Sequence, residues 1–204
     1  MKYKQFNIAI DNFLGVSKVG RDTLALALIA GRTNGKRVLD VGTGTGFVAI
    51  YLASLGKKVE AADISTTSVE AARQNAKINK VDIKVYQSDL FKSASGKYDL
   101  ITFNPPIGTS SSAQTVVFIE RLKSVLPKSD FLFKIGLIFL GNQRRNIIKR
   151  FLKEARLYLS ERGKIVMLLA QGEEKLIHDS NYKIQQENGI QVFIIDNNST
   201  YEKK

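Results

Sequence analysis

Three closely spaced glycines follow an apolar run in Val38-Leu39-Asp40-Val41-Gly42-Thr43-Gly44-Thr45-Gly46. Glycine permits positive φ angles and lets backbone amides come close to a ligand. The turn departs from a dinucleotide fingerprint because residue 47 is Phe, and it lacks the Lys-Ser/Thr ending of a phosphate-binding loop. It therefore indicates a site for a nucleoside-bearing cofactor without a pyrophosphate.

Two acidic residues end the next two apolar segments. Asp63 lies about twenty residues beyond the glycines, and an acid at that place can accept both hydroxyls of a ribose. In Ser88-Asp89-Leu90-Phe91, Asp89 and Leu90 put a carboxylate and an apolar side chain where an adenine would lie. A tight turn and two solvated acids are the simpler explanation of each feature alone. Their occurrence at three successive strand ends favours a cofactor site.

A rigid polar segment, Asn104-Pro105-Pro106-Ile107, follows a fourth apolar run. Two consecutive prolines cannot extend a β-ladder, and they fix a stiff exit from the strand. Strand termination alone is one explanation of the motif. The other is that the Asn104 side-chain carbonyl and the Pro105 backbone carbonyl accept both hydrogens of a substrate NH2 group. Because a planar amide or aromatic amine is a poor nucleophile, such positioning would direct its lone pair toward an electrophilic methyl group.

The composition suits chemistry that needs no protein nucleophile. The 204 residues include no Cys and one His, which excludes disulfides, Cys-ligated zinc and thiolate catalysis. We therefore expect no metal site. The net charge of +12 is compatible with an RNA or DNA partner or with solubility alone. The apolar stretch 131–140 is too short to span a bilayer, and the N-terminus lacks a signal-peptide core, so we expect a cytoplasmic protein without a membrane partner.

Alternating strands and helices must position these residues. The apolar patterns predict strands at 36–41, 58–63, 82–87, 98–103 and 164–170, and helices at 47–55, 66–79, 145–158 and 172–178. Two further strands, 182–188 and 190–195, flank an Asn-Gly turn that is typical of a β-hairpin. The alternation predicts an α/β fold with a mostly parallel sheet, helices on both faces and an antiparallel hairpin at one edge.

We expect one domain over 1–204. An N-terminal lid or cap segment, 1–31, is helical over 22–30 and precedes a cofactor-binding half, 32–106. A substrate-loop excursion, 107–143, separates that half from a C-terminal half, 144–204. Loops of that length inside compact domains are usually functional.

The glycine turn, the Asp63 strand end and the Ser-Asp-Leu-Phe segment together resemble the class I S-adenosylmethionine-dependent methyltransferases over residues 36–106. The resemblance implies a Rossmann-like fold, a seven-stranded sheet with a C-terminal antiparallel hairpin, and S-adenosyl-L-methionine as cofactor. It also implies that Asp40 orders the turn or faces the cofactor amino group. The other implied cofactor-binding residues are Gly42, Thr43, Gly44 and Gly46 at the methionine portion, Asp63 and Ile64 at the ribose, and Asp89 and Leu90 at the adenine.

The Asn-Pro-Pro segment resembles the (Asn/Asp/Ser)-Pro-Pro-(aromatic) signature of methyltransferases that act on exocyclic nitrogens. The resemblance implies a catalytic role for Asn104, Pro105, Pro106 and Ile107, with Asn104 also next to the cofactor. The family usually has an aromatic residue at the last position, where this chain has Ile107. An apolar contact remains, but base stacking would need another ring, for which Phe118, Phe131 and Phe133 are candidates.

Two passages resemble the HemK/PrmC-like branch, whose members methylate the N5 nitrogen of a release-factor glutamine. The segment before the glycine turn, with Arg21, Asp22 and Thr23, resembles one that covers the cofactor, so Arg21 and Thr23 are expected to bind it. Gly141-Asn142-Gln143-Arg144 resembles, in part, a turn before the next helix. The Ser-Asp-Leu-Phe and Asn-Pro-Pro segments also resemble RsmC-like enzymes.

The leading hypothesis is therefore methyl transfer to a planar NH2 group, most similar to the protein glutamine enzymes. One alternative is methylation of an exocyclic base amine, adenine N6 or guanine N2, in RNA or DNA. Another is a weakly active S-adenosylmethionine- or RNA-binding module. The resemblance also admits a small activating subunit as a partner. The cations of the predicted helix, Arg144, Arg145, Lys149, Arg150, Lys153 and Arg156, would suit phosphates or form an ordinary solvated face.

Overall fold

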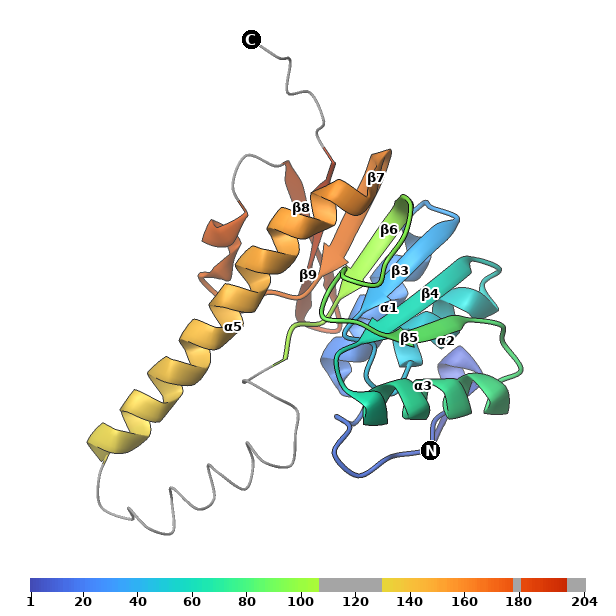
Figure 1. Ribbon diagram of the computed structural model, residues 1–204, viewed down its shortest axis with the longest axis horizontal. Helices are drawn as coiled ribbons and strands as arrows, with labels where there is room; N and C mark the ends of the chain where they lie inside the picture. The colour runs from blue at the N-terminus through green and yellow to red at the C-terminus, as the bar shows by residue number, and fades with distance from the viewer. Residues whose placement is uncertain (107–129, 178–180, 198–204) are drawn as a thin grey trace.

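A computed structural model of the chain describes residues 1–106, 130–177 and 181–197, and over 130–141 it describes the backbone alone. Its main sheet contains seven strands in the order β5-β4-β3-β6-β7-β9-β8 within these residues (Figure 1). The pairs among β3 to β7 are parallel, whereas β9 pairs antiparallel with both β7 and β8. The predicted sheet and its terminal hairpin are confirmed. The strands are β3 (Arg37–Val41), β4 (Lys58–Asp63), β5 (Lys84–Gln87), β6 (Tyr98–Phe103), β7 (Leu159–Met167), β8 (Tyr182–Glu187) and β9 (Ile190–Asp196).

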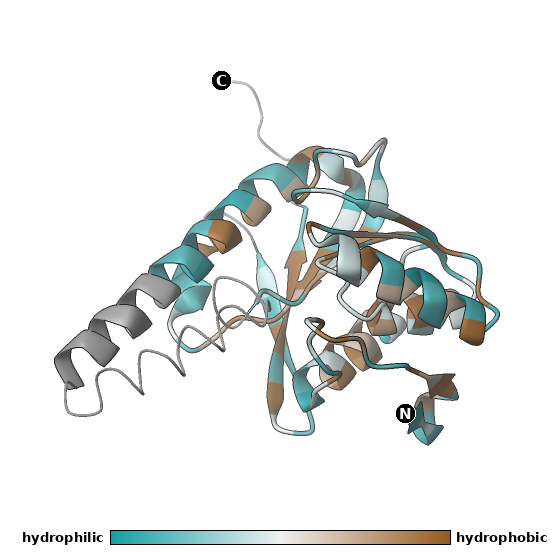
Figure 2. Ribbon diagram, turned by 60° about the horizontal axis from the view of Figure 1, so that its bottom comes forward, coloured by the Kyte–Doolittle hydropathy of each residue, from teal (hydrophilic) through white to brown (hydrophobic). Residues whose placement is uncertain are grey.

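Helices pack against both faces of this sheet. One face is covered by α1 (Arg21–Arg32), α2 (Phe47–Ser54) and α3 (Thr66–Ile78), and the other by α5 (Asp130–Tyr158). Successive residues of a strand point to opposite faces, so Val38 packs toward α1, α2 and α3 whereas Leu39 packs toward α5. Figure 2 shows hydrophobic colour on the central strands, and mainly hydrophilic colour with a few hydrophobic patches on the coloured part of α5. The two buried clusters thus share the sheet as their common wall.

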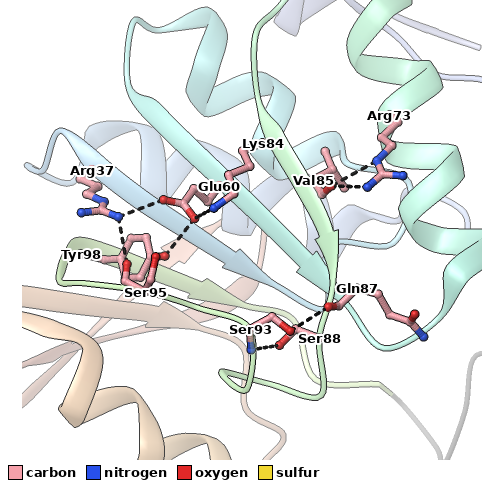
Figure 3. A network of polar contacts seen from close by, with 10 residues as sticks. All are labelled: Arg37, Glu60, Arg73, Lys84, Val85, Gln87, Ser88, Ser93, Ser95 and Tyr98. Atoms are coloured by element: carbon pink, nitrogen blue, oxygen red, sulfur yellow. Dashed lines mark hydrogen bonds and ion pairs between the residues drawn. The ribbon is translucent and has the colours of Figure 1, made fainter.

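A polar network lies on the α5 side of the sheet, near the start of β4, β5 and β6 (Figure 3). The carboxylate of Glu60, which is 6% exposed, accepts hydrogen bonds from Arg37 at 3.0 Å, Tyr98 at 3.1 Å and Lys84 at 3.4 Å. Burial opposes ionisation of Glu60, but the hydrogen bond from Arg37 and the charge of Lys84 lower its pKa below the ordinary value. The connection from β5 to β6 contains no helix, and these paired charges pack beside it.

The N-terminal segment is fixed to α3 by two asparagines. It forms a small hairpin of β1 (Lys2–Tyr3) and β2 (Ile8–Ala9) around the 3-10 turn η1 (Lys4–Phe6). Asn79 exchanges two hydrogen bonds with the backbone of Ala9, at 2.8 and 2.7 Å. Asn75 does the same with Asp11, at 2.8 and 3.2 Å, and also donates to the Thr45 carbonyl of the glycine turn at 2.9 Å. These hydrogen bonds hold the chain close to the glycine turn before α1 begins.

Helix α5 is longer than predicted. It begins at Asp130, whereas the sequence pattern predicted a start at residue 145. The predicted turn at Gly141 is therefore wrong, because residues 141–144 are helical; a single glycine lowers helix stability by only about 1 kcal/mol and does not have to end a helix. The rest of the predicted excursion, 107–129, lies outside the described residues, as do the side chains of Phe118, Phe131 and Phe133.

The C-terminal elements agree with the prediction with small changes. β7 begins directly after α5, but its regular pairing with β6 begins at Lys164, the predicted start. The predicted short helix is the 3-10 turn η2 (Glu173–Leu176). The hairpin of β8 and β9 turns at Asn188 and Gly189, both with positive φ (51° and 79°), as the Asn-Gly dipeptide predicted. None of the helices in the described ranges is long and apolar enough to cross a bilayer.

Candidate active site

A cavity of about 840 Å³ opens at the carboxyl ends of the parallel strands. Open α/β sheets bind their ligands at this edge. Its walls come from the segment before α1, the glycine turn, the ends of β4 and β6, the residues after β5, and α5. The cavity therefore brings together segments that are as much as 132 residues apart, from Gly15 to Ile147.

The glycine turn supplies the floor of this cavity through Gly42, Thr43 and Gly44. Gly42 and Gly44 have φ angles of +66° and +55°, and a Cβ atom on Gly44 would meet no atom of the chain within 4 Å. The amide of Gly44 donates to Asp63 Oδ2 at 3.0 Å, which ties the turn to the end of β4. Gly44 thus presents backbone to open space that a ligand can fill.

Gly46 does not line the cavity, contrary to the role that the resemblance implied. It has a φ of +82° and directly precedes α2. A Cβ atom there would lie 3.0 Å from both Cα and Cβ of Ala72 in α3. Close packing between the turn and α3 is the physical reason for this glycine.

Asp40 is buried beneath the turn and is 3% exposed. Its carboxylate accepts hydrogen bonds from the hydroxyls of Thr43 and Thr102, both at 2.6 Å. Burial raises the pKa of Asp40 from 3.8 to about 6, although these hydrogen bonds act in the opposite direction. Of the two roles considered for Asp40, its contacts match the ordering of the turn.

Two acidic residues stand at the rim, in different surroundings. Asp63 accepts the amides of Gly44 and Ser65, and burial raises its pKa. The hydrogen bonds from Arg150 at 2.6 Å and Lys92 at 3.0 Å lower the pKa of Asp89. Asp63 therefore has no cationic partner in the described part of the chain, whereas Asp89 is paired with two. The apolar neighbours Ile64 and Leu90 line the same cavity, and Ile64 is 66% exposed.

Asn104 is held from the side of α1. Its Nδ2 donates to Asp22 Oδ2 at 3.2 Å and to Thr23 Oγ1 at 3.3 Å. Because Nδ2 faces these two acceptors, Oδ1 of Asn104 is left to accept a hydrogen bond from a ligand. Thr23, expected to bind the cofactor, lines the cavity and also contacts Asn104.

The Pro105 carbonyl, the expected acceptor for a substrate NH2 group, already accepts a hydrogen bond within the protein. Arg144, on α5, donates from Nη1 to the carbonyls of Pro105 at 2.7 Å and Pro106 at 2.8 Å. Sequence reasoning placed Arg144 in the predicted turn before the helix and among the basic residues of the helix, and gave it no role at the Asn-Pro-Pro segment. The 39 residues that separate it from Pro105 leave no local pattern that could have revealed the contact.

Besides Gly46, the expected site residue Arg21 lies away from the cavity. Arg21 begins α1 and donates to the Asn188 carbonyl in the turn of the β8–β9 hairpin at 2.9 Å. Its side chain is therefore absent from the cavity wall, while its neighbours Asp22 and Thr23 lie in it. Ile107 lies outside the described residues.

Comparison with known proteins shows the family of the chain. The model of the methyltransferase small domain family matches residues 17–132, which is more than half of the chain. A protein of Methanocaldococcus jannaschii, named as an N5-glutamine methyltransferase, is 36% identical over 146 residues, 70% of this chain and 67% of that protein. The release factor glutamine methyltransferase of Streptococcus pneumoniae is 36% identical over 132 residues, 64% of this chain but 44% of that enzyme.

A solved structure gives the same fold. The 16S rRNA N2 G1207 methyltransferase RsmC of Thermus thermophilus, in complex with AdoMet and guanosine, matches with a TM-score of 0.63 over 88% of this chain and 44% of that chain. At 17% identity this likeness shows the Rossmann-like fold alone. On the family match and the relatives, the chain belongs to the methyltransferase small domain family of class I S-adenosylmethionine-dependent methyltransferases.

Proposed function

We propose that the protein transfers a methyl group from S-adenosylmethionine to a planar NH2 nitrogen, with the side-chain amide of a protein glutamine as the acceptor. The single observation that carries this proposal is the orientation of Asn104. Its NH2 group is fixed on Asp22 and Thr23, so its carbonyl oxygen is the free acceptor at the cavity wall. The two relatives named for glutamine methylation support the choice of acceptor.

The residues around the cavity fit S-adenosylmethionine. Gly44 faces open space that a side chain would fill, as a turn against the methionine portion requires. The carboxylates of Asp63 and Asp89 would accept hydrogen bonds from the ribose hydroxyls and the adenine amine, with Ile64 and Leu90 beside the rings. When bound, the cofactor supplies an electrophilic methyl group.

The chain's own part in the reaction is positioning. Oδ1 of Asn104 accepts one N–H of the target group, and the second lone pair of the Pro105 carbonyl accepts the other. Holding both N–H bonds fixes the plane of the NH2 group and directs its lone pair toward the methyl carbon. Alignment of this kind is worth several kcal/mol in favourable cases, and it needs no covalent intermediate.

Methylation of an exocyclic base amine in RNA is the second candidate. One observation favours it: Arg145, Lys149 and Lys153 are exposed at four-residue spacing on α5, and none forms an ion pair within the described residues. Side chains at that spacing lie on one side of a helix and suit a phosphate backbone. The RsmC structure, solved with guanosine, belongs to an enzyme of this type.

The test is methyl transfer from labelled S-adenosylmethionine, run in parallel on a release factor with a glutamine in its catalytic loop and on bulk RNA. We expect label in the protein, at the glutamine amide. If only the RNA is labelled, the acceptor is a base amine and not a glutamine. Absence of binding to S-adenosylmethionine in calorimetry would overturn the proposed activity for either acceptor.

Asn104→Ala tests the acceptor geometry. We expect it to lower kcat by about 10²-fold or more, the usual effect of removing one preorganised polar group, while the affinity for S-adenosylmethionine is retained. Asn146→Ala is the matched control, since Asn146 is an exposed asparagine on α5 outside the cavity wall. Unchanged turnover in Asn104→Ala would refute the role of this amide.

A further inference from the structure

Arg144 is the most heavily engaged cation near the cavity. Its side chain is 13% exposed, and Nε and Nη2 donate to the two carboxylate oxygens of Glu173 at 2.8 and 3.1 Å. Nη1 donates to the carbonyls of Pro105 and Pro106 at 2.7 and 2.8 Å. One planar guanidinium therefore connects a carboxylate to two successive proline carbonyls.

These contacts leave Arg144 little capacity for a substrate. A guanidinium has five N–H donors, and four of those of Arg144 are directed at protein oxygens. By contrast, Arg145 is exposed and forms no ion pair in the described parts of the chain. Arg144 is thus built into the protein, although it lies on the cavity wall.

Glu173 is also held in place. It is 6% exposed, and its Oε2 accepts the amide of Ala170 at 2.8 Å. Ala170 follows β7, and Pro105 follows β6, the parallel neighbour of β7. The Arg144–Glu173 pair therefore ties the exits of two adjacent strands together through α5.

The Asn-Pro-Pro segment depends on such outside support. Proline has no backbone N–H, so Pro105 and Pro106 can be fixed only through their carbonyls and their ring contacts. The segment is held on one side by Asp22 and Thr23 of α1, through Asn104, and on the other side by Arg144 of α5. Both expected acceptors for the target NH2 group lie between these two anchors.

We propose that Arg144, fixed by Glu173, is a positioning residue for methyl transfer. It sets the place of the Pro105 carbonyl and occupies one of its two lone pairs, so that only the other can accept an N–H of the substrate. This role rests on the proposed function, because the carbonyl acts on a substrate only if an NH2 group binds there. A displacement of about 1 Å at such a group can lower a rate by about 10²-fold.

The kinetic test compares Arg144→Met, Arg144→Lys and Glu173→Gln with the control Arg162→Met. Arg162 is exposed and has no ion pair in the described ranges. We expect Arg144→Met to lower kcat about 10²-fold with the Kd for S-adenosylmethionine unchanged. Arg144→Lys should not restore the rate, because an ammonium cannot bridge a carboxylate and two carbonyls in one plane. A kcat for Arg144→Lys equal to that of the wild type would refute the bridging geometry.

A second measurement is independent of the substrate. Because prolines have no N–H, it observes the carbonyl carbons, whose NMR chemical shifts report hydrogen bonding to their oxygens. The carbonyl shifts of Pro105 and Pro106 should move in Arg144→Met and in Glu173→Gln relative to the wild type and to Arg162→Met. Equal shifts in all four proteins would overturn the positioning role. If the wild type methylates no acceptor, the proposed function fails, and the carbonyl shifts still decide whether the pair holds the Asn-Pro-Pro segment. Glu173→Gln keeps the size of the side chain and serves if Arg144→Met does not fold.

Discussion

Two glycines of the same turn should respond differently to replacement by alanine: Gly46→Ala should mainly lower stability, and Gly44→Ala should mainly lower the affinity for S-adenosylmethionine. Gly44 and Gly46 both have positive φ angles, +55° and +82°. A Cβ atom on Gly44 would enter the open cavity, whereas one on Gly46 would lie 3.0 Å from two atoms of Ala72. Both variants share the cost of backbone strain. Comparing them therefore separates the steric clash at Gly46 from the loss of ligand space at Gly44.

The magnitudes follow from these contacts. An L-residue in the left-handed region costs about 1–2 kcal/mol, and both variants share this loss. Overpacking against a helix adds roughly 1–3 kcal/mol in Gly46→Ala alone. We therefore expect losses in the free energy of unfolding of about 1–2 kcal/mol for Gly44→Ala and about 2–5 kcal/mol for Gly46→Ala. In the affinity for S-adenosylmethionine the order reverses, with Gly44→Ala weakened at least about tenfold, or 1.4 kcal/mol.

Urea unfolding followed by circular dichroism measures the first quantity, provided that the m-value is unchanged, and titration calorimetry measures the second. The affinity of Gly46→Ala is determined at a temperature at which the variant is fully folded. If Gly44→Ala lost as much stability as Gly46→Ala and kept its affinity for the cofactor, the assignment of one glycine to the cavity and the other to the contact with α3 would be wrong.

Three other changes test further parts of the site. The pKa of Asp40 is raised from 3.8 to about 6 in the folded protein. The free energy of unfolding of the wild type should therefore fall by about 3 kcal/mol as the pH rises across this interval, whereas that of Asp40→Asn should not. Parallel pH profiles of the two proteins in urea unfolding would contradict the shift. Phe151 is fully buried and stacks on Phe103 at 4.2 Å, so Phe151→Ala should cost about 3–5 kcal/mol by the same assay, and a loss below about 1 kcal/mol would show that the contact contributes little. Asp22→Ala releases the Asn104 amide and should lower kcat about 10- to 100-fold at unchanged cofactor affinity, while a fall in affinity alone would place Asp22 at the cofactor instead.

The sheet was predictable because its signals are local. Strand boundaries at Val41, Asp63 and Phe103 coincide with a glycine, an acid and a proline pair that end each apolar run. The Asn188-Gly189 turn likewise needs only two residues to define a hairpin. The start of α5 carried no such signal, because the pattern near Gly141 is compatible with both a turn and a continuous helix.

The parts of the site that the sequence did not reveal depend on contacts across the fold. Gly46 looks like Gly44 in the sequence, and only the approach of Ala72 distinguishes their roles. The contact of Arg21 with Asn188 joins residues 167 positions apart, and no periodicity predicts it. The contacts of Arg144 are of the same kind. Motifs therefore indicated which segments line the cavity, whereas tertiary packing decides which of their side chains reach it.

The attachment of the N-terminal segment to α3 has a consequence for the order of folding. Asn75 and Asn79 bind backbone groups 64 to 70 residues earlier in the chain, and Asn75 also binds the glycine turn. A contact of that separation closes a long loop, whose entropic cost is recovered only after α3 and its strands have formed. The segment that contains Ala9 and Asp11 should thus dock only after α3 has formed, although it is made first. Residues 15–20, most of which line the cavity, follow this segment closely, so the completion of this wall is coupled to the docking of the N-terminus on α3.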